Sequence, residues 1–344
     1  PTLIRQTVQT ELQDTKALYD TPRRTILAGA APATPRVAQT PEKLEIVDSA
    51  CHVLVTATGL AGRGEFAEGV PSSTKRTPHD AILATLSTRV RGSLGAITGS
   101  GTLHVFSPMD LPVFEGGSLK LAQGTPLRAY LGLSAADGAI VAVVNLEEEP
   151  TVALGTAAGV IKRVSLAGLP ERPHHALISL KEGDSLVGAA VAPDNSHLVF
   201  ITSAGSLLNF SATQVRPQGT SAAGMQGIQV PEGHRVIALA AVRRDDAVVV
   251  TLSGSTEVLP GTESARAKRS ALSEFPVKGR ATSGVRAHTF LKGENILTTA
   301  FVGYSPCAVG PRGQTIDLPG ELSKRDASGS LVEGSVAALG EALT

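Results

Sequence analysis

The stretch that decides the fold is GTAAGVIKR, residues 155–163. It places a tight Thr-x-x-Gly turn after an apolar run, and the strand-like step that follows ends on two adjacent cations, Lys162 and Arg163. A chain that reverses between two strands needs a residue with positive φ, which glycine adopts without strain. The stretch therefore predicts a β-hairpin with a basic pair on its second strand.

The same turn recurs along the chain. The copies end at Gly59, Gly101, Gly159, Gly205 and Gly254, and a degenerate copy ends at Gly313. A charged turn followed by an apolar strand also repeats, at 181–191, 231–242 and 291–302. Chance recurrence does not explain two features that repeat together, and a solenoid usually keeps a shorter and stricter period. Six helix-free units of roughly 40–60 residues predict an all-β fold of six blades around an axis.

Composition limits the class of protein. The chain has 344 residues, 42% of them hydrophobic, with 31 Lys and Arg against 31 Asp and Glu, which predicts a folded soluble protein without net charge. Aromatic residues make up only 3%, so base stacking cannot dominate any nucleic-acid surface. Cys51 and Cys307 are expected to be reduced thiols in a cytoplasmic, nucleoid-associated protein, and no apolar run is long enough to predict a membrane partner. The start at Pro1 suggests a piece of something longer.

Four regions are expected along the chain. Residues 1–27 contain a short helix, because Ile4, Val8 and Leu12 recur every four positions. A Pro- and Ala-rich linker follows at 28–43. The bladed domain is expected at 44–326, where short Val-, Ile- and Thr-rich runs alternate with Gly and Pro, and a C-terminal tail at 327–344.

Several of these motifs resemble a known family. TAAGVIKRVSLAGLP (156–170) and KRSALSEFPVKGRATSGVRAHTFLKGENIL (268–297) are similar to the C-terminal domain of the A subunit of bacterial type IIA topoisomerases, DNA gyrase and topoisomerase IV. The resemblance covers about residues 44–320. It implies a six-bladed β-pinwheel, propeller-like, whose basic rim bends double-stranded DNA and guides a segment to the catalytic core. Residues 1–27 resemble the end of that core.

Two departures from the family pattern affect what the resemblance implies. Gyrase carries a Gln-Arg-Arg-Gly-Gly-Lys-Gly-like box after its first blade's turn, whereas residues 69–83 here keep only Lys75 and Arg76. Topoisomerase IV is therefore the better match, with relaxation and decatenation as its activity, and gyrase with negative supercoiling is the alternative. None of the three tyrosines follows an arginine as the cleavage motif requires, so no catalytic residue is expected on this chain.

The resemblance also implies partners and cofactors. The chain would belong to an A subunit that forms a heterotetramer with an ATPase B subunit. No cofactor or metal site is expected in this fragment, because ATP and Mg would be used by other domains of the enzyme.

A repeated fold can align scattered cations along a curved edge. Each phosphate that is neutralised releases a counterion, so the cations must share one arc, and net charge matters little. Contacts to phosphates rather than bases are expected, since no helix is available to enter a groove. The cations expected to bind DNA are Lys75, Arg76, Arg89, Arg91, Lys162, Arg163, Arg172, His174, Arg216, Lys268, Arg269, Lys278, Arg280 and Arg286.

Other interpretations remain open from the residues alone. A basic pair at a strand end can be a solvated or edge-protecting feature. His174 and His175 are adjacent as metal ligands sometimes are, but no Cys or acidic cluster accompanies them. A propeller that binds partner proteins is the main alternative. A hydrolytic or redox propeller ranks last, because no convergent set of carboxylates is visible.

Overall fold

The computed structural model describes residues 2–20, 47–66, 69–72, 75–114, 119–244, 246–257 and 265–343. The chain divides into two compact units, Pro1–Ile46 and Val47–Thr344. Helix α1, Thr2–Tyr19, belongs to the first unit, and its apolar residues Ile4, Val8 and Leu12 are exposed. The expected linker at 28–43 lies outside the described residues. Among the described helices, none is long and apolar enough to cross a bilayer.

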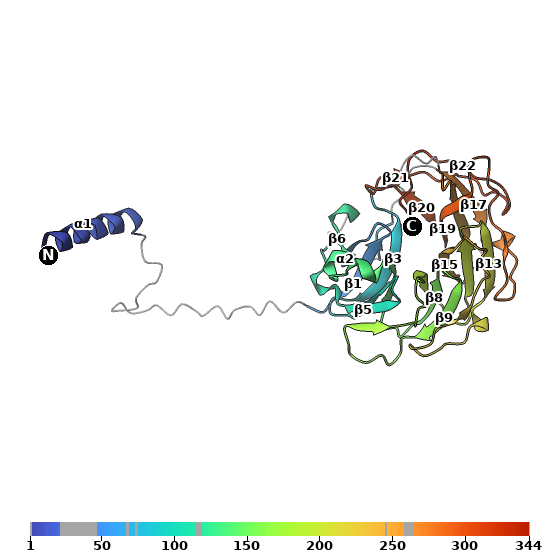
Figure 1. Cartoon of the computed structure of the whole chain (residues 1–344), viewed down its shortest axis with the longest axis horizontal. Coiled ribbons are helices and arrows are strands. Elements are labelled where there is room, and N and C mark those ends of the chain that lie inside the picture. The colour runs from blue at the N-terminus through green and yellow to red at the C-terminus, as the bar shows by residue number, and fades with distance from the viewer. Residues whose placement is uncertain are drawn as a thin grey trace. The chain divides into compact units, whose positions relative to one another are not determined.

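The second unit consists of short antiparallel strands around a common centre (Figure 1). In its described residues the strands form six blades: blades 2 to 5 are separate four-stranded sheets, and blades 1 and 6 are joined in one seven-stranded sheet. The prediction of an all-β pinwheel with a short N-terminal helix is confirmed. Short runs of β-branched residues between Gly and Pro produce this pattern, because each run spans one strand before the chain must turn.

From the centre outward, blade 1 contains β3 (Ile82–Arg89), β1 (Ala50–Thr56), β2 (Leu60–Gly64) and β6 (Thr125–Pro126). Blade 2 contains β7 (Ile140–Asn145), β4 (Leu94–Thr98), β5 (Thr102–Phe106) and β10 (His174–Ala176). Blade 3 contains β11 (Leu186–Val191), β8 (Thr151–Thr156), β9 (Val160–Ser165) and β14 (Met225–Gln226).

Blade 4 contains β15 (Val236–Val242), β12 (His197–Thr202), β13 (Ser206–Ser211) and β18 (Val285–Arg286). Blade 5 contains β19 (Ile296–Gly303), β16 (Val248–Gly254), β17 (Arg266–Ala271) and β22 (Ser330–Leu331). Blade 6 contains β23 (Ala338–Glu341), β20 (Pro306–Val309) and β21 (Thr315–Ile316). The short helices are α2 (Leu127–Tyr130) and the 3-10 turns Pro108–Asp110, Leu121–Gln123, Ala135–Asp137, Ala212–Gln214 and Leu272–Glu274.

Neighbouring blades exchange strands. The outer strand of blade 3, β14, follows the hairpin of blade 4 in the chain but pairs with β9 of blade 3. The outer strands of blades 1, 2, 4 and 5 are supplied in the same way. We call the stretch from the end of a hairpin to the outer strand that it donates an exchanged segment; the five segments are 107–126, 166–176, 212–226, 272–286 and 317–331.

The ring of blades is closed. The inner strands β3, β7, β11, β15, β19 and β23 pack against one another in succession, and β23 returns to β3. Glu341 of β23 pairs with Ile82 of β3, and the amide of His79 donates to the carbonyl of Gly313 in blade 6 at 2.7 Å. Residues 327–344 were expected to be a tail, but they supply β22 and β23. A run this short and Gly-rich has no strand signal of its own, and its pairing comes from the strand edges that β17 of blade 5 and β20 of blade 6 offer.

The recurring turn has a clear physical basis. Thr56, Thr156 and Thr202 are buried, and each hydroxyl accepts the amide four residues later, across the turn. Gly159 and Gly205 have φ of 86° and 80°. Positive φ is likewise found at Gly59, Gly101 and Gly313.

Gly254 differs from the other turn glycines. It is the last residue of β16 and pairs with Ile296, and the bulge that marks the turn threonine elsewhere falls at Ser253. Ser253 therefore occupies the turn position that the sequence motif had assigned to Thr251. The register identifies Arg266, across from Ser253, as the first residue after this turn.

The core lies between blades rather than at one centre. Phe200, Phe210 and Ile161 pack together across blades 3 and 4, and equivalent aliphatic clusters fill the other interfaces. Burial of these faces is what holds short strands in place. Cys51 and Cys307 are free thiols buried in this core, and burial raises the pKa of Cys307 to about 12.

Candidate nucleic-acid interface

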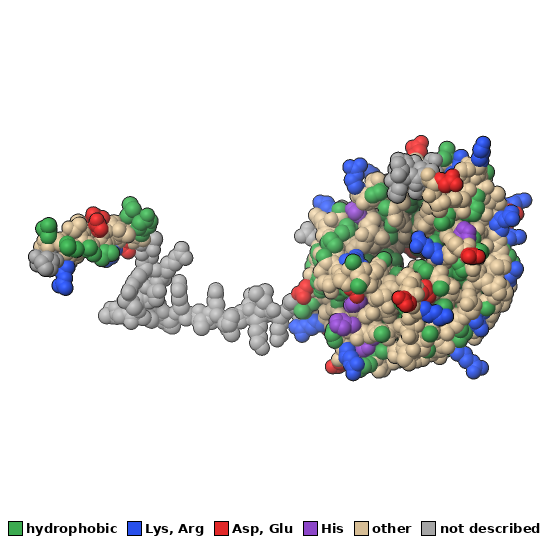
Figure 2. All heavy atoms as spheres, viewed as in Figure 1, with side chains coloured by type: hydrophobic (Ala, Val, Ile, Leu, Met, Phe, Trp, Pro, Cys, Tyr) green, Lys and Arg blue, Asp and Glu red, His purple; other side chains and the backbone are tan. Residues whose placement is uncertain are grey.

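The exchanged segments form the outer edge of the pinwheel, and each carries an exposed cation. Lys and Arg side chains project from much of the outline of the second unit (Figure 2). Along the successive exchanged segments, the exposed cations include Lys120, Arg172, Arg216, Lys278 and Lys324. The repeat thus places an exposed positive charge on the outer segment of successive blades, which an arc of phosphate contacts requires.

Five of the expected cations lie on these segments as exposed residues: Arg172, His174, Arg216, Lys278 and Arg286. Arg280 lies on one as well, but it is half-buried and its guanidinium donates to the carbonyl of Gln226. Sequence reasoning missed Lys120 and Lys324. Their position before an outer strand was the available signal, but it becomes visible only once strand exchange is known.

Positive charge is concentrated on the outer edges of blades 3 and 4. Segment 212–226 contains one cation and no acidic residue, and segment 272–286 contains three cations and one acidic residue. Segment 317–331 instead contains two cations and three acidic residues. A DNA duplex would therefore be attracted most strongly to segments 212–226 and 272–286.

Lys162 and Arg163 lie inside the protein rather than on the rim. The Lys162 ammonium is fully buried and donates to the carbonyls of Leu177, Thr220 and Ala222 at 2.7–3.0 Å. Burial lowers its pKa to about 8. Because its donors are used internally, Lys162 cannot meet a phosphate in this structure.

The Arg163 guanidinium, like the Lys162 ammonium, uses its hydrogen-bond donors on groups inside the protein. It donates to the carbonyls of Ala192, Ala212 and Val215 at 3.0–3.1 Å and pairs with Asp194 at 2.7 Å. With only 2% of the residue exposed, it too differs from the expected solvent-facing cation. Strand exchange is the reason, because it covers β9 with a segment from the next unit.

The second basic pair repeats this arrangement in blade 5. Lys268 is buried and donates to the carbonyls of Ala287, Lys324 and Arg325, and burial lowers its pKa to about 8. Arg269 is half-buried and donates to the carbonyls of Pro319 and Gly320. Both pairs therefore bind the exchanged segment that crosses them.

The remaining expected cations lie away from the exchanged segments. Arg76 pairs with Asp80 at 2.5 Å and donates to the Ala308 carbonyl of blade 6, so it joins the first and last blades. Lys75, beside it, is exposed. Arg89, at the end of inner strand β3, pairs with Asp48 at 2.8 Å, and Arg91 follows on the connection to the next blade. The structure does not bring these four residues together with the cations of blades 3 and 4.

Comparison with known proteins agrees with this architecture. The family model of the DNA gyrase C-terminal domain, a β-propeller, matches residues 150–193, 196–243 and 257–302. The resemblance to the C-terminal domain of the topoisomerase A subunit is confirmed. The first two matched stretches each span a hairpin, the exchanged segment that follows it and the inner strand of the same blade, and the third covers the same parts except β16.

Curated relatives of this chain include A subunits of DNA gyrase. The protein from Klebsiella oxytoca is 32% identical over 169 residues, 48% of this chain and 18% of the relative. The protein from Salmonella typhimurium is 30% identical over 190 residues, 54% of this chain and 20% of the relative. The matched part thus spans about a fifth of these relatives.

Solved structures of this family share the fold. The C-terminal domain of DNA topoisomerase IV aligns with a TM-score of 0.65 at 20% identity, covering 86% of this chain and 93% of that domain. The DNA gyrase A C-terminal domain aligns with a TM-score of 0.58 at 17% identity, covering 85% of this chain and 99% of that domain. The chain is thus similar in sequence to the C-terminal domain of gyrase A and shares its fold with the C-terminal domains of gyrase A and topoisomerase IV.

Proposed function

We propose that the pinwheel binds and bends double-stranded DNA for an ATP-dependent type IIA topoisomerase. It guides a duplex segment over the outer edge of blades 3 and 4 to the catalytic core, for relaxation and decatenation of the topoisomerase IV kind. In this proposal the core carries the catalytic tyrosine, and ATP and Mg are used by the other domains and the B subunit. The observation that carries the proposal is the exposed cation on each exchanged segment.

The chemistry of the edge fits phosphate rather than base recognition. Arg216 and Lys278 are exposed, and in the described part of the chain their side chains make no ion pair. Bending 20–30 bp through 40–90° costs about 1–6 kcal/mol, so several such contacts must act together. Segments 212–226 and 272–286 lie on adjacent blades and can supply them along one curved path.

Gyrase-type wrapping is the second candidate, because curated relatives of this chain include gyrase A subunits. What favours topoisomerase IV is the stretch 69–83, which lacks the Gly-Gly of the gyrase box and whose Arg76 is engaged with Asp80 and Ala308. Sealing nicked plasmid in the presence of the chain distinguishes the two. A large positive writhe trapped per bound chain identifies gyrase-type wrapping, and little change in linking number identifies simple bending.

Salt-dependent binding to a ~100-bp duplex tests DNA binding itself. The double variant Arg216→Gln/Arg286→Gln should lower the slope of log K against log salt by about 2, one per lost phosphate contact. Lys181→Gln/Arg243→Gln removes the same charge from exposed residues outside the exchanged segments and should leave the slope nearly unchanged. Equal losses for the two variants would mean a nonspecific charge effect, and no binding at low salt would leave a protein-interaction propeller.

A further inference from the structure

One position of the hairpin alternates around the ring. We call it the slot residue: the fourth residue after the turn glycine, or its register equivalent in blade 5. From blade 1 to blade 6 the slot residues are Arg63, Val105, Arg163, Asn209, Arg269 and Asp317. Arginine thus stands in blades 1, 3 and 5, and shorter side chains stand in the other three.

In blade 3 the slot is filled by the guanidinium of Arg163. Two of its acceptors, the carbonyls of Ala212 and Val215, belong to the exchanged segment, and a third, the carbonyl of Ala192, directly follows the inner strand β11. The neighbouring Lys162 binds the same segment further along, at the carbonyls of Thr220 and Ala222. Arg216 lies between these two anchor points.

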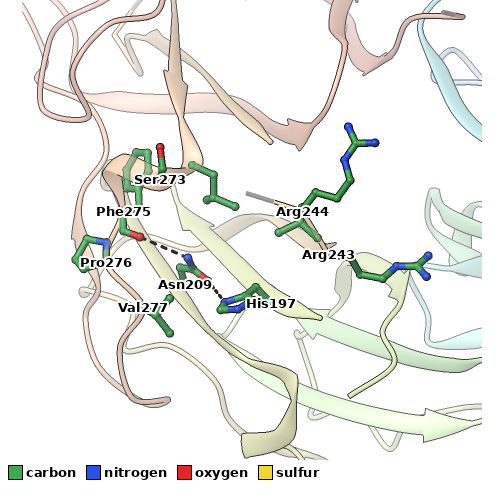
Figure 3. A pocket seen from close by; sticks show the side chains of 10 residues that line it. His197, Asn209, Arg243, Arg244, Ser273, Phe275, Pro276 and Val277 are labelled. Carbon is green, nitrogen blue, oxygen red and sulfur yellow. Dashed lines mark hydrogen bonds between the residues drawn. The ribbon is translucent and has the colours of Figure 1, made fainter. Parts of the chain in front are cut away.

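In blade 4 the slot is open. The side chain of Asn209 bonds to His197 and, at 3.4 Å, to the carbonyl of Phe275. A cavity of about 200 Å³ is lined by these residues together with Val242, Leu272, Arg243 and Arg244 (Figure 3). The hairpin register and the shared 3-10 turn place Leu272 and Phe275 where blade 3 has Ala212 and Val215. The cavity therefore marks the space that an arginine side chain fills in blade 3.

We propose that Lys162 and Arg163 are positioning residues: they hold segment 212–226 so that the exposed Arg216 is already in place for a phosphate. This inference rests on the proposed DNA binding. Lys268 and Arg269 hold segment 317–331, with Lys324, in the same way. Blade 4 has Leu208 and Asn209 at the positions of Lys162 and Arg163. Segment 272–286 is therefore not held by an anchoring lysine or arginine of blade 4.

The two ends of the segment are fixed by the buried Ala212 and Val215 and by β14, and the amide of Gln218 donates to the Arg163 carbonyl, but the stretch around Arg216 has few other contacts. Strand β14 has two residues, and 216, 217 and 219–221 are exposed. Ordering a loop on binding costs affinity, whereas a loop ordered beforehand avoids that cost. Charge-assisted bonds from a buried ammonium and guanidinium are strong enough to supply this order.

Arg163→Asn tests the proposal, because asparagine is the residue that the same fold accepts in blade 4. Hydrogen exchange at the amides of Val215, Gln218 and Ala222 should accelerate, while β8 and β12 stay protected. Arg269→Asn is the matched control: it should accelerate exchange in 317–331 and leave 212–226 unchanged.

DNA binding supplies the second readout. Arg163→Asn should weaken binding to the ~100-bp duplex about two- to tenfold, the cost of ordering one or two side chains on binding. In an Arg216→Gln background the same substitution should have almost no further effect, because Arg163 acts through Arg216.

The outcomes separate the two proposals. Unchanged exchange in 212–226 would overturn the positioning role whether or not DNA binds, and so would equal losses of affinity with and without Arg216. Accelerated exchange in a chain that binds no DNA would overturn the proposed function and leave the anchoring itself intact.

Discussion

The contact between Arg76 and Asp80 should decide whether the ring stays closed. Arg76 makes two bonds to the Asp80 carboxylate, at 2.5 and 2.8 Å, and two to carbonyls of blade 6, at Ala308 and Ile316. Asp80 is 7% exposed, so Arg76→Met would leave its carboxylate buried without its main partner. We expect the seam between blades 1 and 6 to open locally in this variant.

The magnitude follows from the geometry. Removing one partner of a buried ion pair costs about 3–5 kcal/mol. The Arg76 side chain keeps 30% exposure, and the amide of Thr77 still donates to Asp80 at 3.1 Å, so water and this bond offset part of the loss. About 2–3 kcal/mol remains, which corresponds to roughly 30- to 150-fold faster exchange at seam amides.

Hydrogen exchange at His79, whose amide bonds to Gly313 across the seam, measures this opening. Arg89→Met is the matched control: the side chains of its pair with Asp48 are 57% and 37% exposed, so the substitution should cost little stability and leave the seam unchanged. Arg76→Met/Asp80→Asn should recover part of the loss. If seam amides of Arg76→Met exchange as in the unsubstituted chain, Arg76 does not hold the ring closed.

Three further outcomes are expected. In an Arg244→Asp background, which puts a carboxylate where blade 3 has Asp194, Asn209→Arg should fill the cavity of blade 4 and stabilise the chain by about 0.5–2 kcal/mol relative to Arg244→Asp alone, seen as a higher Tm; a lower Tm would mean that the slot is not built for a guanidinium. Burial lowers the pKa of His288 from 6.5 to about 4, so the unfolded state takes up a proton that the folded state does not. Stability in urea should therefore fall as pH falls from 6.5 to 4, and less steeply in His288→Gln; equal slopes would contradict this. Cys51 and Cys307 should resist iodoacetamide at pH 8 until the chain unfolds, since burial raises both thiol pKa values; rapid labelling of folded chain would show that they are accessible.

Much of the fold is predictable from local patterns. Thr156 and Gly159 define a turn because the hydroxyl and the positive φ act within five residues. In blade 5 the same pattern misleads, since Thr251-x-x-Gly254 matches the motif while the register puts Ser253 at the turn. Only cross-strand pairing reveals that shift.

The candidate site was predictable only in part. Arg216, Lys278 and Arg286 are exposed on exchanged segments as the rim hypothesis requires, whereas Lys162 and Lys268, which fit the motif best, are buried. A basic residue at a strand end has the same sequence signal in both cases.

The sequence by itself determined the number of units and most of their hairpin turns, because these depend on contacts between near neighbours in the chain. Tertiary structure alone decided which cations face solvent and how the ring closes. The carbonyls that bind Lys162 lie 15 to 60 residues away along the chain. Strand exchange brings them together, and a backbone carbonyl leaves no mark in the residue types that supply it.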